Sequence, residues 1–216
     1  MFFCVTRLFC ILAAAISLAG CITTSMQGYA DLQPPSTPIR SIAAIANPAL
    51  IPALAQEAAK RGVQLVDARQ ILPPTRQYTE ADVRAAMSAN GIDGVLVVEV
   101  TGDTGVNRHH VGTVANTSFS GTYSNDAVVI GNSIYGSGSV SGSATTVTTP
   151  VYGYSRSVSF QAQLSDPKTS RKFWVGSGTT KAGGALFVGD SSSASDAAAS
   201  IFNDLQSKGL IGGRSS

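Results

Sequence analysis

Two histidines stand side by side in this sequence, His109 and His110, and the chain has no others. With Asp103 nearby they offer the nitrogen and oxygen atoms that transition metals bind. Adjacent side chains of a strand point to opposite faces, so the two imidazole rings do not converge on one ion. We therefore expect a solvated strand end here and predict no metal site.

Three other patterns share residue types with catalytic or phosphate-binding sites but lack their spacing. Gly189-Asp190-Ser191 resembles the nucleophile block of some esterases, yet no histidine follows residue 110 to act as the base, so we expect a loop and helix cap. The run 176–181 has the glycines and threonines of a phosphate loop without its spacing or its helix. The remaining acidic candidates show no acid/base spacing and are typical of caps and turns: Asp67, Asp82, Asp93 and Glu99. We predict no catalytic, cofactor-binding or metal-binding residue and no enzymatic activity.

Cys21 has the clearest chemical role, because of the segment that precedes it. Arg7 supplies a positive charge, residues 8–16 are almost entirely apolar, and residues 17–20 are mostly small. This order is typical of an export signal that ends at a cleavage site, so residues 1–20 are predicted to be a signal peptide. The apolar run is shorter than the roughly 20 residues that a transmembrane helix needs.

A cysteine directly after such a site, in the run Leu18-Ala19-Gly20-Cys21, is similar to the lipobox of bacterial lipoproteins. The resemblance implies that the thiol of Cys21 receives a diacylglyceryl group, that the signal is cut before it, and that the new N-terminus is acylated. Several acyl chains give stable membrane anchoring. In enterobacterial lipoproteins an Asp after the cysteine favours the inner membrane, so Ile22 implies the periplasmic face of the outer membrane. The alternative is an ordinary secretory signal followed by a chance cysteine.

Charge and composition bound the rest of the chain. There are 15 Lys and Arg residues against 13 Asp and Glu, so no electrostatic reason exists to expect a nucleic-acid partner. Residues 22–38 are rich in Thr and Ser and contain three prolines, which resist regular structure. We predict a lipidated N-terminus and linker over 21–38, a single domain over 39–211, and a tail over 212–216.

Strand and helix signals alternate after the linker. Short apolar runs predict strands over 39–46, 63–68 and 94–101. A helix is predicted over 48–61 with Asn47 as its N-cap, and Thr79 with Asp82 predicts the capping box of a second helix. Helices between successive strands predict a locally parallel sheet.

The end of the chain has the signals of a hairpin and a helix. Alternating runs over 157–164 and 172–179 predict a β-hairpin, with Trp174 packed in its second strand. A helix is predicted to start near Ser193 and to end at Lys208, after which Leu210 and Ile211 fold back. The fold class is therefore α/β: a mixed sheet with a βαβαβ start, an inserted long β-hairpin or loop, an antiparallel β-hairpin and a C-terminal helix.

This layout resembles small Gram-negative lipoproteins whose domain is similar to the N-terminal domain of the translocation protein TolB. Lipoprotein activators of penicillin-binding proteins and the curli secretion channel lipoprotein share that type of domain. The resemblance covers residues 39–105 and 156–211. It rests on the strands 93–98 and 173–176 and on the ending 205–211, and it implies a fold more than a function.

The insertion over residues 111–155 is rich in Gly, Ser and Thr, and Asp126 is its one Asp, Glu, Lys or Arg residue. Both halves alternate with a period of two, and Ser124-Asn125-Asp126 is a candidate start of the connection between them. Three interpretations remain open: a flexible hairpin or partly disordered loop, a strand pair inserted in a membrane, or a β-arm that pairs with a partner. The hairpins from which the curli channel builds its barrel make the last two relevant.

These observations predict a lipid-anchored cell-envelope protein that acts as a non-enzymatic binding or assembly factor. One alternative is a subunit of a homo-oligomeric outer-membrane secretion or export assembly that uses the 111–155 arm. A second is a hydrolase with an unrecognised site. The expected partners are the membrane, through the lipid on Cys21, and either another envelope protein or further copies of the chain. No cofactor and no nucleic acid are expected.

Overall fold

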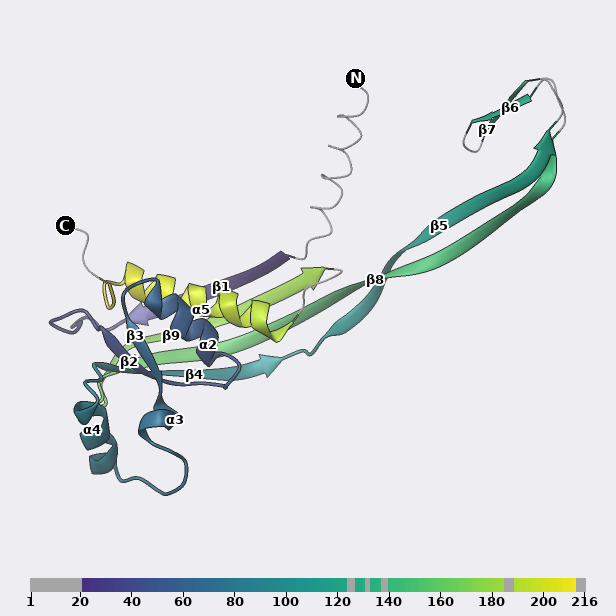
Figure 1. The fold of residues 1–216 in the computed structure, drawn as a ribbon. Helices are drawn as coiled ribbons and strands as arrows, with labels where there is room; N and C mark the ends of the chain where they lie inside the picture. The colour runs from purple at the N-terminus through teal and green to yellow at the C-terminus, as the bar shows by residue number, and fades with distance from the viewer. Residues whose placement is uncertain (1–20, 124–126, 131–132, 137–139, 185–188, 213–216) are drawn as a thin grey trace. The chain divides into compact units, whose positions relative to one another are not determined.

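The computed structural model describes residues 21–123, 127–130, 133–136, 140–184 and 189–212. The predicted signal peptide, most of the predicted tail and the proposed connection at 124–126 lie outside these residues. The chain forms two compact units (Figure 1). The first contains the described residues up to Asn107 and from Tyr154 onward, and the second is formed by Arg108–Gly153.

The first unit is built on one mixed sheet, whose strand order is β1-β9-β8-β4-β2-β3. Strand β2 pairs in parallel with both β3 and β4, as the alternation of strands and helices predicted. The remaining neighbours, β4 with β8, β8 with β9 and β9 with β1, are antiparallel. The strands are β1 (Cys21–Ala30), β2 (Ser41–Ile45), β3 (Gln64–Asp67), β4 (Gly94–Asp103), β8 (Val140–Ser165) and β9 (Lys172–Gly184).

Helices cover the two faces of this sheet unequally. Helices α2 (Ile51–Ala59) and α5 (Asp190–Ser207) pack on one face, while α3 (Ala68–Ile71) and α4 (Glu80–Ala89) lie at the end formed by β2 and β3 (Figure 1). The larger core lies under α2 and α5 and includes Trp174. A smaller cluster joins α3 and α4 to the opposite face. The predicted α/β class, with its βαβαβ start, antiparallel hairpin and C-terminal helix, is confirmed.

The first residues of the helices show which sequence signals were enough to predict where a helix begins. Thr79 and Asp82 form the predicted capping box of α4. Helix α2 begins later than expected, with Leu50 as its N-cap. The Asn47 side chain accepts a hydrogen bond from the Ala49 amide, and the Asn47 backbone carbonyl accepts one from the Leu50 amide. These bonds form a turn over residues 47–50 that precedes the helix. Helix α5 begins earlier than expected, at Asp190, where a carboxylate is favourable beside the helix N-terminus.

The chain after α5 closes the core. Gly209 has a positive φ of 69°, which suits a residue just past a helix end. Leu210 and Ile211 then fold back and are buried, as predicted. The carbonyl of Leu210 accepts a hydrogen bond of 2.9 Å from the amide of Ile39. The segment just before β2 and the segment just after α5 therefore lie in contact.

The expectation that residues 22–38 resist regular structure is wrong for the first nine of them. Cys21–Ala30 form β1, which pairs along its length with β9, from Cys21 opposite Gly183 to Ala30 opposite Trp174. Exposure alternates along β1, and the half-buried Met26 and Ala30 pack on the core. Thr and Ser occur in strands as well as in linkers, and here the pairing with β9 makes the segment a strand. No helix or strand forms over 31–38.

The second unit consists of paired strands. Strand β5 (Asn107–Tyr123) pairs with β8, and β6 (Ala127–Ile130) pairs with β7 (Ser133–Gly136). The hydroxyls of Thr117 and Thr146 lie 3.0 Å apart, and the Ser118 hydroxyl lies 3.5 Å from the Thr145 carbonyl oxygen. The described part of the insertion is therefore a β-ribbon and not an irregular loop.

Candidate functional site

The ribbon formed by residues 108–123 and 140–153 is here called the arm. Over residues 108–121 and 141–150 its side chains are exposed on both faces of the ribbon. Val111, Phe119 and Val147 are each at least half exposed. The sequence of both arm strands beyond His110 contains no charged residue. Among the described residues, the arm parts of β5 and β8 pair only with each other, so one backbone edge of each strand has no partner.

Such a ribbon has little to stabilise it by itself. An isolated two-stranded hairpin is marginally stable in water, because it buries almost no apolar surface. Natural strand edges are usually protected by Lys, by Pro or by a covering element. Pro150 is the arm's one proline, and no lysine lies in either strand. The arm is therefore suited to pair with another strand.

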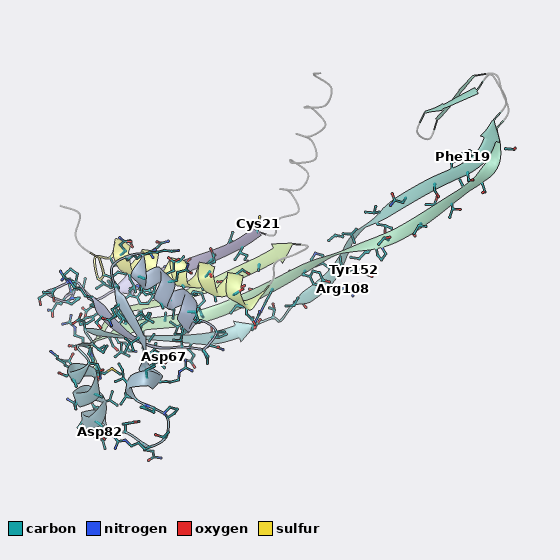
Figure 2. The ribbon with its side chains drawn as sticks, in the orientation of Figure 1. Cys21, Asp67, Asp82, Arg108, Phe119 and Tyr152 are labelled. Atoms are coloured by element: carbon teal, nitrogen blue, oxygen red, sulfur yellow. The ribbon has the colours of Figure 1, made fainter. Side chains whose placement is uncertain are left out.

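The base of the arm is held by side-chain packing around Tyr152 (Figure 2). The Arg108 guanidinium lies 3.4 Å from the centre of the Tyr152 ring, a cation–π contact. The His110 ring meets the same tyrosine edge-on, with 5.8 Å between ring centres. His109 instead lies over Gly153, where an added Cβ would stand 2.8 Å from its Nε2 atom. The two histidines thus contact different residues, and the described residues contain no metal-binding cluster of His, Cys, Asp or Glu.

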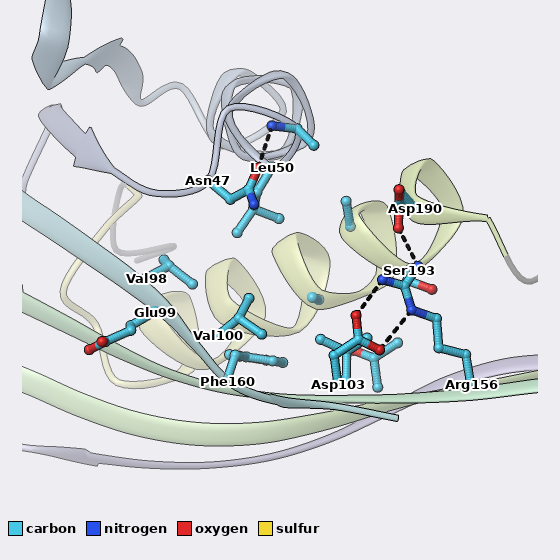
Figure 3. Close-up of a pocket in the computed structure, with 15 residues that line it drawn as sticks. Asn47, Leu50, Val98, Glu99, Val100, Asp103, Arg156, Phe160, Asp190 and Ser193 are labelled. Carbon is cyan, nitrogen blue, oxygen red and sulfur yellow. Dashed lines mark hydrogen bonds and ion pairs between the residues drawn. The ribbon is translucent and has the colours of Figure 1, made fainter. Parts of the chain in front are cut away.

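A cavity of about 530 Å³ opens in the first unit between the sheet and α5 (Figure 3). Its walls are mostly apolar side chains from β4, β8 and α5, and the buried Thr180 contributes a hydroxyl. Thr180 is already bonded to the Thr24 hydroxyl at 2.7 Å. Ser193 also lines the cavity, but neither histidine does. The cavity therefore contains no serine–histidine pair for nucleophilic catalysis.

An ion triad closes one side of this cavity. The Arg156 side chain donates two hydrogen bonds to Asp103, of 3.0 and 2.5 Å, and a further one to Asp190 (Figure 3). Hydrogen bonds from Arg156, followed by one from the Gly105 amide, lower the pKa of Asp103 to about 2. The same two carboxylates raise the pKa of Arg156. Because the one Arg156 guanidinium bonds both carboxylates, the triad acts as a clasp that joins β4, β8 and the start of α5.

The other sequence candidates have structural roles. Gly189 is the N-cap of α5 and Asp190 its first residue, so the esterase-like pattern is a helix start. The run 176–181 lies within β9 and forms no phosphate loop. Asp67 caps α3, and a hydrogen bond from Arg69 lowers its pKa.

The carboxylates of Asp93 and Asp82 likewise accept hydrogen bonds from backbone amides. The Asp93 carboxylate accepts hydrogen bonds from the amides of Arg40 and Ser41, at 3.0 and 3.1 Å. The Thr79 amide donates to Asp82 and lowers the pKa of that carboxyl. Sequence reasoning did not identify Arg156, whose partners come from distant parts of the chain and leave no local signal.

Cys21 is the first residue of β1, where its side chain is exposed and its thiol is free (Figure 2). Its neighbour across the strand pair is Gly183 of β9. Lipidation of Cys21 stays a prediction. Within the described part of the chain, no helix has both the length and the apolar character needed to cross a membrane.

Comparisons with known proteins add only distant likenesses. No family model matches this sequence, and no curated protein matches it either. Among solved structures, the chain is similar to the PelC dodecamer from Paraburkholderia phytofirmans, with 12% identity, coverage of 87% of this chain and 97% of that one, and a TM-score of 0.41. It is also similar to a PDZ domain protein from Parabacteroides distasonis, with 9% identity, coverage of 86% and 36%, and a TM-score of 0.32. TM-scores of this size do not establish a shared fold, so neither likeness assigns a function, and the resemblance to TolB-like domains stays a prediction.

Proposed function

We propose that this chain is a lipid-anchored cell-envelope protein that has no catalytic activity and assembles with other copies of itself through the arm. The observation that carries the proposal is the arm itself: two long strands with no charge beyond His110, exposed on both faces and paired only with each other among the described residues. Pairing with a second arm would satisfy its open edges and bury its exposed valines.

The membrane anchor of this proposal is the lipid on Cys21, on the periplasmic face of the outer membrane. The signal-like segment before Cys21 supports it. Since β1 starts at Cys21 itself, an acyl chain there would be attached directly to a strand of the sheet. The anchored domain would therefore sit at the bilayer surface without a flexible spacer. Copies confined to one surface meet more often than copies in solution, which favours weak self-association.

The test is removal of the arm from the otherwise intact chain. Replacing residues 109–153 by a short Gly-Ser link leaves the flanking segments in contact, because the Thr104 amide donates a 3.0 Å hydrogen bond to the Ser157 carbonyl. We expect a circular dichroism spectrum and melting transition typical of a folded domain. Sedimentation in detergent is expected to show an oligomer for the parent chain and a monomer for the deletion.

A pair of point variants separates the arm from a general effect of surface charge. Val147→Lys places a charge on the arm, where the side chain is 60% exposed, and Val106→Lys places one outside it, where exposure is 56%. We expect only Val147→Lys to lower the sedimentation coefficient. A monomeric parent chain, or equal behaviour of both variants, would exclude assembly through the arm.

A further inference from the structure

In the described part of the chain, no helix covers one face of the sheet where β1, β9, β8 and β4 lie side by side. The larger core lies under α2 and α5 on the opposite face, and α3 and α4 cover only the region near β2 and β3. Across the uncovered part, strand register aligns Gln27 with Ser177, Ser177 with Gln161, and Gln161 with Glu99. This row crosses four strands, a width of roughly 14 Å at the usual strand spacing. We call this surface the open face.

The neighbouring rows of the open face have the same chemistry. On one side Ser25 lies opposite Thr179, which lies opposite Ser159. On the other side Tyr29 lies opposite Val175, which lies opposite Gln163. These three rows contain mostly hydroxyl and amide groups, with Val175 and the Val97 that lies opposite Gln163 as apolar members, and Glu99 supplies their only charge.

The open face is hollowed. Two shallow depressions, of about 370 and 560 Å³, are lined by residues of these rows. Both depressions are lined by Gln27 and Ser177, so they adjoin at the central row. Lys172 lies at the border of the smaller one. The surface is thus a groove wide enough for an extended, polar ligand.

The polar side chains of the groove make few hydrogen bonds to one another. The Ser159 and Thr179 hydroxyls lie 3.2 Å apart, and the Gln27 amide donates to the Tyr29 hydroxyl at 2.5 Å. Gln161 is exposed on this face and Gln163 is half-buried. Each amide can donate and accept at once, which is also what sugar hydroxyls do.

We propose that the open face binds a strand of neutral polysaccharide. The rows of amides and hydroxyls match the hydroxyls of a glycan, and the ring of Tyr29, 61% exposed, offers a flat surface to the C–H face of a sugar. A polyanion is not favoured, because Glu99 and Lys172, the charged residues that line the smaller depression, have opposite signs. A second protein is disfavoured because the centre of a protein interface is usually apolar and aromatic, whereas this groove is polar at its centre.

The test uses the full mature chain and a panel of neutral glycan probes. Native gels containing soluble glucan, xylan or chitin oligosaccharides would show retarded migration, with heparin as the anionic comparison. The variant Gln27→Ala with Gln161→Ala removes two amides from the central row. Gln56→Ala, an equally conservative change of an exposed amide on α2, is the matched control.

We expect at least one neutral glycan to retard the parent chain, the double variant to weaken that binding at least tenfold, and Gln56→Ala to leave it unchanged. Unaltered circular dichroism of all variants shows that the fold is intact. The proposal is overturned if no neutral glycan of the panel binds, if heparin binds more tightly, or if the double variant binds as the parent does. A double variant that changes the sedimentation coefficient would instead assign the open face to contact with another copy.

Discussion

Gly28 is the position where β1 would be most sensitive to one added carbon atom. A Cβ at Gly28 would stand 1.9 Å from the Asp204 Oδ2 atom and 2.4 Å from the Trp174 Nε1 atom. Those two atoms form a hydrogen bond of 2.6 Å, so Gly28→Ala must either separate them or move β1 off β9. The variant therefore tests whether β1 belongs to the folded domain or is the linker that composition suggests.

The cost can be worked from these contacts. Losing a hydrogen bond to a charged acceptor costs about 1.5–3 kcal/mol, and inserting a carbon into a packed site costs about 1–3 kcal/mol. Replacing glycine also restricts the unfolded chain, which returns about 0.4–1 kcal/mol. We expect Gly28→Ala to lower the free energy of unfolding by about 2–4 kcal/mol.

Urea unfolding followed by fluorescence is a direct assay, because Trp174 is the one tryptophan of the chain and lies at the altered contact. Gly183→Ala is the matched control, since among the described residues its Cβ would meet nothing nearer than a carbonyl oxygen at 3.8 Å. We expect that control to change the free energy of unfolding by less than about 1 kcal/mol. Equal, small effects of the two variants would refute the packing of β1 on Trp174 and Asp204.

Three further predictions follow from the described contacts. Trp174→Ala should lower the free energy of unfolding by about 3–5 kcal/mol in urea titrations, because the ring is only 1% exposed, and a loss below about 1 kcal/mol would contradict its burial. The pKa of Asp103 is lowered to about 2, so its stabilising contribution is present above the unfolded-state pKa of about 3.9 and is lost as the pH falls through about 2. Asp103→Asn should therefore reduce the urea midpoint at pH 6 more than at pH 2, and an equal reduction at both would argue against the clasp. Cys21→Ser should abolish incorporation of labelled palmitate and release the protein from sedimented membranes, whereas equal label on both chains would exclude Cys21 as the lipid site.

The sequence was sufficient to predict features that depend on residues close together in the chain. The capping box of Thr79 and Asp82 and the fold-back of Leu210 were both predictable from a few adjacent residues. The parallel pairing of β2 with β3 and β4 followed from the alternation of strands with helices.

Features that depend on distant partners were not predictable from the sequence. Strand β1 has the composition of a linker, and only its pairing with β9, far along the chain, makes it part of the sheet. The same holds for Arg156, which joins Asp103 to Asp190 across three elements. The alternation in the insertion correctly indicated strands, but it contained no information about how β5 and β8 would expose both faces. The open face also required the register of four strands, since its rows combine residues from four separate segments.

Hydrogen–deuterium exchange at several protein concentrations tests assembly through the arm most directly. Backbone amides on the unpaired edges of β5 and β8 exchange quickly in a free arm, because they donate to water and not to a protein acceptor. If arms pair with one another, amides over 111–121 and 141–150 should become protected as the concentration rises, while protection of the core strand β4 stays constant. Rapid exchange over both arm segments at every concentration would contradict the account.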